Sequence, residues 1–212
     1  MTPRLWALLV VLSGAMLLDA LEVSTTVVAL PAVSAELGLS PETGQWLMGG
    51  FALGFGGLLL SGGRLVDLFG RRRVYLVALA GFAVASVVCG AASGGGLLIA
   101  GRVAKGMCVA LTAPTGLALI AAEFPEGRAR ARALSVYSLA GAGGFSVGLL
   151  LSGLLTEVSW RWTFLFPVPV AAALLVAGWF LVPSTTPGPS GVLGSSGVPG
   201  PSGTSGPSAP PG

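Results

Sequence analysis

Six long apolar runs, separated by short segments rich in charge, Gly or Pro, dominate the chain. Their approximate limits are 5–30, 46–66, 74–92, 97–121, 133–155 and 162–182. A bilayer core of about 30 Å requires about 20 consecutive apolar residues in a helix. The pattern therefore predicts an all-α integral membrane bundle of six transmembrane helices over residues 1–182, with the lipid bilayer as its solvent.

Residues 183–212 form a segment of a different kind, without charge and dominated by Pro, Gly and Ser. The Gly and Pro residues lack the strict three-residue period of collagen. Such a composition cannot bury enough surface to offset the entropy of ordering the chain. We expect a disordered C-terminal tail or an out-of-frame end rather than a second domain.

The first apolar run has some features of a cleavable signal peptide, because Arg4 precedes it and small residues lie near Ala20. The apolar pattern continues to Pro31, however, and five further runs follow. These features favour a retained membrane helix over a cleaved leader.

The composition agrees with lipid as the solvent. Apolar residues make up 53% of the 212 positions and charged residues only 9%, against about 25% charged in soluble domains. The net charge of +3 sits in short clusters between apolar runs, which argues against a nucleic-acid partner. Histidine is absent and only two cysteines occur, so we expect no metal, no cofactor and no enzyme activity.

The basic residues of the connections predict the orientation in the membrane. Eight arginines lie before the first run or in the connections after the second and fourth: Arg4, Arg64, Arg71, Arg72, Arg73, Arg128, Arg130 and Arg132. The alternate connections hold only Arg161. Since Lys and Arg accumulate on the cytoplasmic side, we expect a multi-pass protein of the inner (plasma) membrane with both termini in the cytoplasm.

Four ionisable residues fall inside the apolar runs, where each is costly and therefore a functional candidate. Asp19 and Glu22 lie in the first run, and Arg102 and Lys105 lie in the fourth. At about 1.5 Å per residue, the two pairs occupy overlapping depths in the outer half of the membrane. Each pair is spaced i, i+3, on one helix face. We expect the two acids to face the two bases.

A buried carboxylate near a cation experiences opposing influences and can load and release a proton near neutral pH. The hypothesis is that Asp19 or Glu22 carries an exchanged proton, with Arg102 as its counter-charge. The alternative is that the four charges only hold helices together, or that Glu22 and Arg102 extend to the outer interface.

The connection between the second and third runs carries the clearest motif, Gly63-Arg64-Leu65-Val66-Asp67-Leu68-Phe69-Gly70-Arg71-Arg72-Arg73. Glycines allow close approach or positive φ at a sharp turn, an Asp suits a neighbouring helix N-terminus, and arginines stay at the membrane surface. The segment resembles the signature loop of the major facilitator superfamily, G-x-L-x-D-x-x-G-R-R/K-R/K. The resemblance implies a gating loop formed by Gly63, Asp67, Gly70, Arg71, Arg72 and Arg73.

Three further segments resemble the drug/proton antiporter branch, particularly its fourteen-helix members. They are Leu21-Glu22 with Val28-Ala29-Leu30-Pro31, Arg102-Val103-Ala104-Lys105-Gly106, and Trp160-Arg161-Trp162-Thr163-Phe164-Leu165. Glu22 then occupies the branch's acidic position and Arg102 its proton-linked arginine, while Lys105 replaces the usual Gln. Asp19 is an additional acid one turn earlier.

The fifth run departs from the antiporter pattern G-P-x-x-G-G, because residues 148–153 contain no proline. Small residues still recur every four positions at Ala140, Gly144, Gly148 and Ser152. This spacing is typical of helix packing in membranes, so we expect Gly144, Gly148 and Ser152 to face another helix.

The resemblance covers about residues 5–182 and corresponds to the N-terminal six-helix half of such a transporter. It implies proton-coupled export of small molecules, with protons and a small-molecule substrate as partners and a second six-helix half or a homodimer mate completing the cavity. The alternative is a truncated, non-transporting remnant, or a six-span protein that is active only when paired with a second half.

Overall fold

The computed structural model describes residues 2–183, and every regular element in this range is an α-helix. The helices are α1 (Pro3–Leu37), α2 (Pro41–Phe69), α3 (Arg71–Gly90), α4 (Gly95–Glu123), α5 (Arg128–Val158), α6 (Trp160–Leu165) and α7 (Pro167–Leu181). With α6 and α7 counted as one span, six helices are long and apolar enough to cross a membrane. The predicted all-α bundle of six transmembrane helices is confirmed. The tail expected over 183–212 lies, apart from Pro183, outside the described residues.

Local chemistry sets the sharp turn between the first two helices. Gly38, at φ +60°, ends α1 in the left-handed conformation that glycine adopts without strain. Ser40 then caps α2 by accepting a hydrogen bond from the Thr43 backbone N–H, and Pro41 occupies the first helical position. Only residues 38–40 separate the two helices, so α1 and α2 must run in opposite directions.

Two predicted boundaries differ from the structure at prolines. The first helix does not end near residue 30 but continues through Pro31 to Leu37, because Ala29 and Val33 on either side of the proline are fully buried and packing outweighs the lost hydrogen bond. The sixth run is divided at Phe166 into α6 and α7. Pro167 has no N–H to continue the helix and instead starts the next one.

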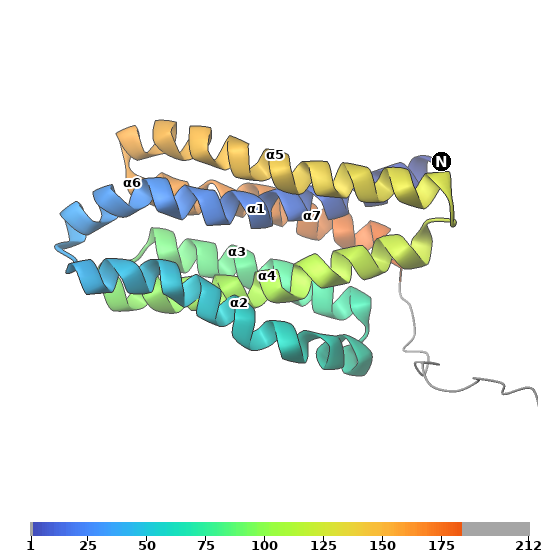
Figure 1. Ribbon diagram of the computed structural model, residues 1–212, viewed down its shortest axis with the longest axis horizontal. Helices are drawn as coiled ribbons and strands as arrows, with labels where there is room; N and C mark the ends of the chain where they lie inside the picture. Colours follow the sequence, from blue (N-terminus) through green and yellow to red (C-terminus); the bar gives the residue numbers. More distant parts are fainter. Residues whose placement is uncertain (1, 184–212) are drawn as a thin grey trace, which may run out of the picture.

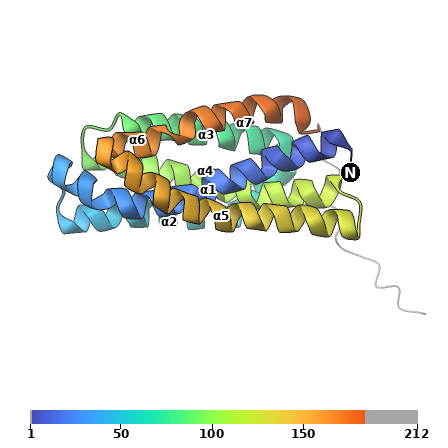
Figure 2. The same ribbon diagram turned by 90° about the horizontal axis from the view of Figure 1, so that it is seen from above.

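The helices surround a central pair, α1 and α4. The most extensive contacts join α1 to α5, α4 to α2, and α4 to α3. Figure 2 shows α2 and α5 along one side of the bundle and α3, α6 and α7 along the other, with α1 and α4 between them. The outer helices expose large apolar side chains, such as Leu60 and Leu150, which suits contact with lipid tails or another membrane-embedded surface.

The two ends of the bundle differ in charge. Figure 1 places the N-terminus, the α2–α3 and α4–α5 connections and the end of α7 at one end of the molecule. This arginine-rich end carries the eight arginines on which the predicted orientation depends, whereas Arg161 at the start of α6 lies at the opposite end. The helices therefore separate the two sets of basic residues by the length of the bundle.

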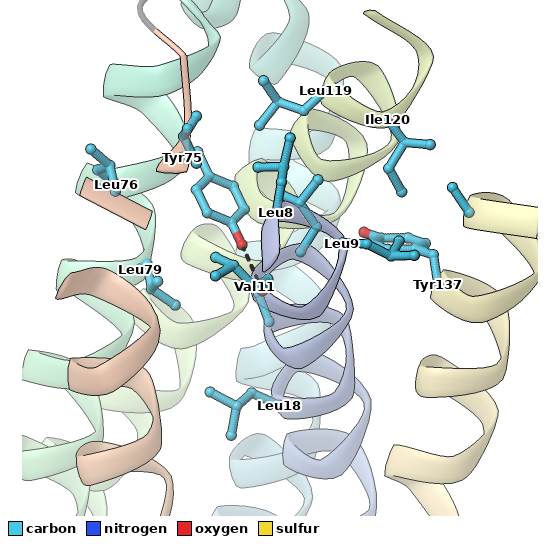
Figure 3. Packing of buried hydrophobic residues seen from close by; sticks show 14 of the residues in the cluster. Leu8, Leu9, Val11, Leu18, Tyr75, Leu76, Leu79, Leu119, Ile120 and Tyr137 are labelled. Atoms are coloured by element: carbon cyan, nitrogen blue, oxygen red, sulfur yellow. Dashed lines mark hydrogen bonds between the residues drawn. The ribbon is translucent and has the colours of Figure 1, made fainter. Parts of the chain in front are cut away.

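Two apolar clusters fill the interior. The larger one lies toward the arginine-rich end and includes Leu8, Leu9, Val11 and Leu18 of α1. In Figure 3, Tyr75 and Tyr137 approach α1 from opposite sides, and the Tyr75 hydroxyl donates a hydrogen bond of 3.4 Å to the Val11 carbonyl oxygen.

The second apolar cluster lies nearer the other end and contains Ala29 and Val33 of α1 with Leu47, Leu98, Trp160 and Phe164. Along α1, Asp19 and Glu22 fall between the two apolar clusters. Asp19 and Glu22, the two buried ionisable residues of α1, thus lie in a narrow layer between two apolar regions of the interior.

Candidate functional site: a buried charge cluster between α1 and α4

Glu22, Arg102 and Lys105 form one ion cluster inside the bundle, which we call the buried ion cluster. The Arg102 Nη1 donates to one carboxylate oxygen of Glu22. The Lys105 Nζ donates to the other oxygen at 2.6 Å. Glu22 and Lys105 are fully buried and Arg102 is only 2% exposed. The alternative that Glu22 and Arg102 extend to the outer interface is therefore wrong: in the folded chain each finds its counter-charge in the interior.

Close packing of α2 against α4 positions the guanidinium of Arg102. A Cβ at Gly106 would overlap the Phe51 carbonyl oxygen, and one at Gly54 would overlap the Val103 carbonyl oxygen. The two helix backbones therefore touch, as small residues permit in membrane bundles. This contact brings the ring centre of Phe51 to 4.6 Å from the guanidinium carbon of Arg102. The Arg102 Nε donates a hydrogen bond of 3.4 Å to the Leu47 carbonyl oxygen.

Aromatic rings surround the ammonium group of Lys105. The ring centre of Phe82 on α3 lies 4.9 Å from the Nζ, and that of Phe164 on α6 lies 5.3 Å away. Cation–π attraction stabilises a desolvated ammonium at such distances. The rings and Glu22 together replace the hydration shell of Lys105, so the buried ion cluster ties α1 and α4 to α2, α3 and α6.

Asp19 occupies a separate position one turn from Glu22. Its carboxylate accepts a hydrogen bond of 2.7 Å from the Thr112 hydroxyl on α4 and is 6% exposed. Within residues 2–183 it forms no ion pair. The expectation that both acids face a base is therefore wrong for Asp19. Because α4 runs antiparallel to α1, Asp19 meets a residue two turns beyond Lys105, and that residue is a threonine.

The loop between α2 and α3 differs in part from the expected turn. Gly70 has φ +81° and ψ 146°, a conformation essentially restricted to glycine. Gly63 was expected to serve the same purpose, but it lies inside α2 without positive φ, and a Cβ there would meet nothing within 4 Å. The turn needs one special backbone conformation, and Gly70 supplies it after the helix has already ended.

The charged residues of the expected gating loop lie in the end of α2 and the start of α3 and have different surroundings. Arg72 donates a hydrogen bond to the Trp179 carbonyl oxygen on α7 and lies over the ring of the same residue at 5.5 Å. Asp67 is exposed, and no hydrogen bond to its side chain arises from residues 2–183. Arg71 is partly buried and Arg73 exposed. In the described part of the chain, only Arg72 thus links the loop to a different helix.

The small residues of α5 lie against α1. A Cβ on Gly144 would overlap the Leu17 carbonyl oxygen, and one on Gly148 would meet the Ser24 hydroxyl oxygen. One turn further along, the Ser152 hydroxyl donates a hydrogen bond of 2.9 Å to the Thr25 carbonyl oxygen. These three positions let α5 approach the helix that carries Asp19 and Glu22.

A second polar network, at the end of the bundle opposite the arginine-rich end, was missed by sequence reasoning. The Glu36 carboxylate accepts hydrogen bonds from the Trp160 indole nitrogen at 2.8 Å and from Arg161. Arg161 also donates to the Ala92 carbonyl oxygen at 3.3 Å. The network joins the ends of α1 and α3 to the start of α6. No local spacing connects Glu36 with Trp160, because 124 positions separate them.

Sequence reasoning also missed Thr112 and the three phenylalanines around the cations. Thr112 could have been found, since it stands seven residues after Lys105 and hence on the same face of α4. The phenylalanines carry no comparable signal among many apolar residues. Among residues 2–183, no three His, Cys, Asp or Glu side chains gather in a way that could hold a metal ion.

Comparison with known proteins gives a consistent family. The sequence pattern described as "Major Facilitator Superfamily" matches residues 12–206. Over 175 residues the chain is 45% identical to the puromycin resistance protein pur8 of Streptomyces alboniger, covering 82% of this chain and 35% of that protein. Over 169 residues it is 40% identical to the cephamycin export protein CmcT of Amycolatopsis lactamdurans, covering 79% of this chain and 34% of that protein. The chain thus spans about a third of the length of the curated relatives it matches.

Solved structures agree in fold. A D-xylose–proton symporter superposes with a TM-score of 0.73 at 18% identity, over 85% of this chain and 48% of that one. A bacterial homologue of the human lysosomal transporter Spinster, in an inward-facing and unoccupied conformation, superposes with a TM-score of 0.72 at 20% identity, over 93% and 47%. The six-helix bundle, the signature loop and the matched residues have one common explanation: the chain belongs to the Major Facilitator Superfamily.

Proposed function

We propose that the chain forms half of a proton-coupled transporter that exports small molecules across the plasma membrane. Support comes from relatives named for puromycin resistance and cephamycin export. The observation that carries the proposal is the buried ion cluster together with Asp19, four ionisable groups held at membrane depth between apolar clusters. Charges at this depth are costly, and their usual use in membrane proteins is an ion or substrate pathway.

The two acids have different roles in this proposal. Glu22 is bonded to two cations and has no free carboxylate oxygen, which suits a fixed charge that holds α1 against α4. Asp19 has one neutral partner, Thr112, and its carboxylate can gain a proton without breaking an ion pair. Asp19 is therefore the proposed proton carrier. The net positive charge left on the buried ion cluster serves as the counter-charge when Asp19 is ionised.

A second half completes the transporter in this proposal, because the chain covers about a third of its export relatives. The surface of the second half would meet the exposed end of α2 that carries Asp67, which together with Gly70 and the arginines 71–73 would act as a gate. The arginine-rich end would face the cytoplasm, and both termini of the chain are proposed to be cytoplasmic.

The test is proton-driven uptake into everted membrane vesicles. Vesicles are prepared from cells that produce the chain alone, and from cells that also produce the part of the puromycin resistance protein that this chain does not cover. We expect puromycin accumulation that collapses when a protonophore dissipates the gradient. Accumulation should fall to the level of empty vesicles in Asp19→Asn. Undiminished proton-driven uptake in the Asp19→Asn, Glu22→Gln double variant would contradict the proposal.

The second candidate function is a membrane protein that does not transport by itself. The observation that favours it is the same coverage of about a third of the relatives' length. Uptake only when the complementary polypeptide is present would identify a paired half. Absence of uptake in both preparations, with the chain folded in the membrane, would identify a non-transporting protein.

A further inference from the structure

The Thr112 hydroxyl has one hydrogen to donate, and three oxygen atoms lie close enough to accept it. The Thr112 Oγ1 is 2.7 Å from the Asp19 carboxylate oxygen, 3.2 Å from the Val109 carbonyl oxygen and 3.3 Å from the Cys108 carbonyl oxygen. A threonine hydroxyl donates one hydrogen bond and accepts up to two. The hydroxyl must therefore choose between the acid on α1 and the backbone of its own helix.

We propose that Thr112 is a hydroxyl switch that satisfies Asp19 in both of its protonation states. When Asp19 is ionised, the Thr112 hydroxyl donates to the carboxylate. When a proton binds to Asp19, the new carboxyl O–H donates to the Thr112 Oγ1, and the threonine hydrogen turns to the carbonyl oxygen of Val109 or Cys108. One proton is added to the pair, no covalent bond of the threonine changes, and every donor keeps an acceptor. This inference rests on the proposed function, which requires Asp19 to gain and lose a proton.

The switch matters because the side chains of Asp19 and Thr112 are both buried. Asp19 is 6% exposed and Thr112 is 3% exposed. A buried donor or acceptor without a partner costs the full loss of its hydration. An acid whose only partner could donate but not accept would suit its ionised form alone. A hydroxyl partner with a backbone acceptor in reach suits both forms without movement of a helix.

From the described residues, the structure shows one hydrogen bond to the Asp19 carboxylate, that of the Thr112 hydroxyl. The other titratable groups close enough to interact with it are Glu22 on α1, Tyr75 on α3, Cys108 on α4 and Tyr137 on α5. Both tyrosine hydroxyls donate to backbone carbonyl oxygens, those of Val11 and Ala113. Glu22 is bonded to Arg102 and Lys105, and α7 carries no titratable side chain between Pro167 and Leu181. Thr112 is thus the side chain that already bonds Asp19 and that has backbone acceptors within reach of its own hydrogen.

The experiment is an infrared titration of the purified chain in lipid nanodiscs, which requires no transport. The band of a protonated carboxyl group is assigned to Asp19 by its loss in Asp19→Asn. In Thr112→Val, which keeps the shape but removes the hydroxyl, the protonated acid loses the Thr112 oxygen as its acceptor, and its carbonyl band should move to higher frequency. Thr112→Ser keeps the hydroxyl and should leave the band in its original position.

Thr115→Val is the matched control, because Thr115 is equally buried on the same helix and its hydroxyl has no partner among residues 2–183. It should leave the Asp19 band unchanged. If Thr112→Val does not fold, Thr112→Ala gives the same comparison. An unshifted band after loss of the hydroxyl, or no Asp19 band in the original chain at any pH, would overturn the switch. Transport measured in vesicles would be judged separately, so failure of the switch and failure of the exporter proposal are distinguishable.

Discussion

Lys105 donates a hydrogen bond of 2.6 Å to Glu22 from the opposite side of the α1–α4 interface, and both side chains are fully buried. Arg102 binds the other oxygen of the same carboxylate. One acid therefore neutralises part of the charge of two bases, and the stability of the bundle depends on that acid more than on either base alone.

Replacing Glu22 by Gln should destabilise the chain strongly. The change leaves two buried cations without a counter-charge, and breaking a buried pair in this way costs about 3–5 kcal/mol. Thermal unfolding in detergent, followed by circular dichroism, measures the loss. Glu126→Gln is the control, because the Glu126 side chain is 86% exposed and its pair with Arg130 lies at the surface, where such a pair is worth at most about 1 kcal/mol. Equal midpoints for the two variants would contradict the role assigned to Glu22.

Adding a methyl group at Gly54 should separate α2 from α4. The new Cβ would overlap the Val103 carbonyl oxygen, and overpacking of this kind costs about 1–3 kcal/mol. The guanidinium of Arg102 should also lose its contact with Phe51. Gly56→Ala is the matched control in the same helix, because a Cβ there meets nothing within 4 Å. The two melting temperatures should differ clearly, and a Gly54→Ala chain as stable as the control would show that the helices can move apart freely.

Gly70→Ala should strain the turn between α2 and α3, whereas Gly63→Ala should not. At φ +81° and ψ 146°, a side chain costs about 1–3 kcal/mol. Gly63 is helical and open, so alanine there should be neutral or gain up to about 1 kcal/mol. Equilibrium unfolding of both variants checks the contrast. A loss at Gly63 equal to that at Gly70 would mean that the loop glycines act through something other than backbone conformation.

Glu36→Ala should loosen α6 without unfolding the bundle. The change removes the carboxylate that accepts hydrogen bonds from Trp160 and Arg161. Because the side chains of Glu36 and Arg161 are both partly exposed, the expected loss in the free energy of unfolding is about 1 kcal/mol. Hydrogen–deuterium exchange should become faster in residues 160–165 and stay unchanged in the α4 segment around Thr112. Unchanged exchange in α6 would show that the network does not hold this helix in place.

The orientation can be checked with single cysteines in a chain carrying Cys89→Ala and Cys108→Ala. Arg128 and Glu42 are both exposed and lie at opposite ends of the bundle. A membrane-impermeant maleimide should label Glu42→Cys in intact cells and Arg128→Cys only after lysis. The opposite result would reverse the proposed topology.

The number of membrane-spanning helices follows from the sequence, because each apolar run is long enough for only one structure in a bilayer. The meeting of Glu22 with Arg102 and Lys105 also follows, since depth and i, i+3 spacing leave few alternatives. The partner of Asp19 could not be predicted from the sequence, because it depends on the relative position of the two antiparallel helices along their axes. The Glu36 network and the phenylalanines around the cations depend on tertiary packing, which leaves no periodic signal in the chain.

The separation of Glu22 from Arg102 along the sequence has a consequence for synthesis. The two residues are 80 positions apart, and at 5–20 residues per second a ribosome needs about 4–16 s to cover that interval. During this time the two acids of α1 have no cationic neighbour. The free-energy cost of placing an acid near the centre of an inserted helix is about 2.5–3.5 kcal/mol. Until α4 emerges from the ribosome, the first helix therefore carries an electrostatic cost in the membrane that the folded bundle no longer has.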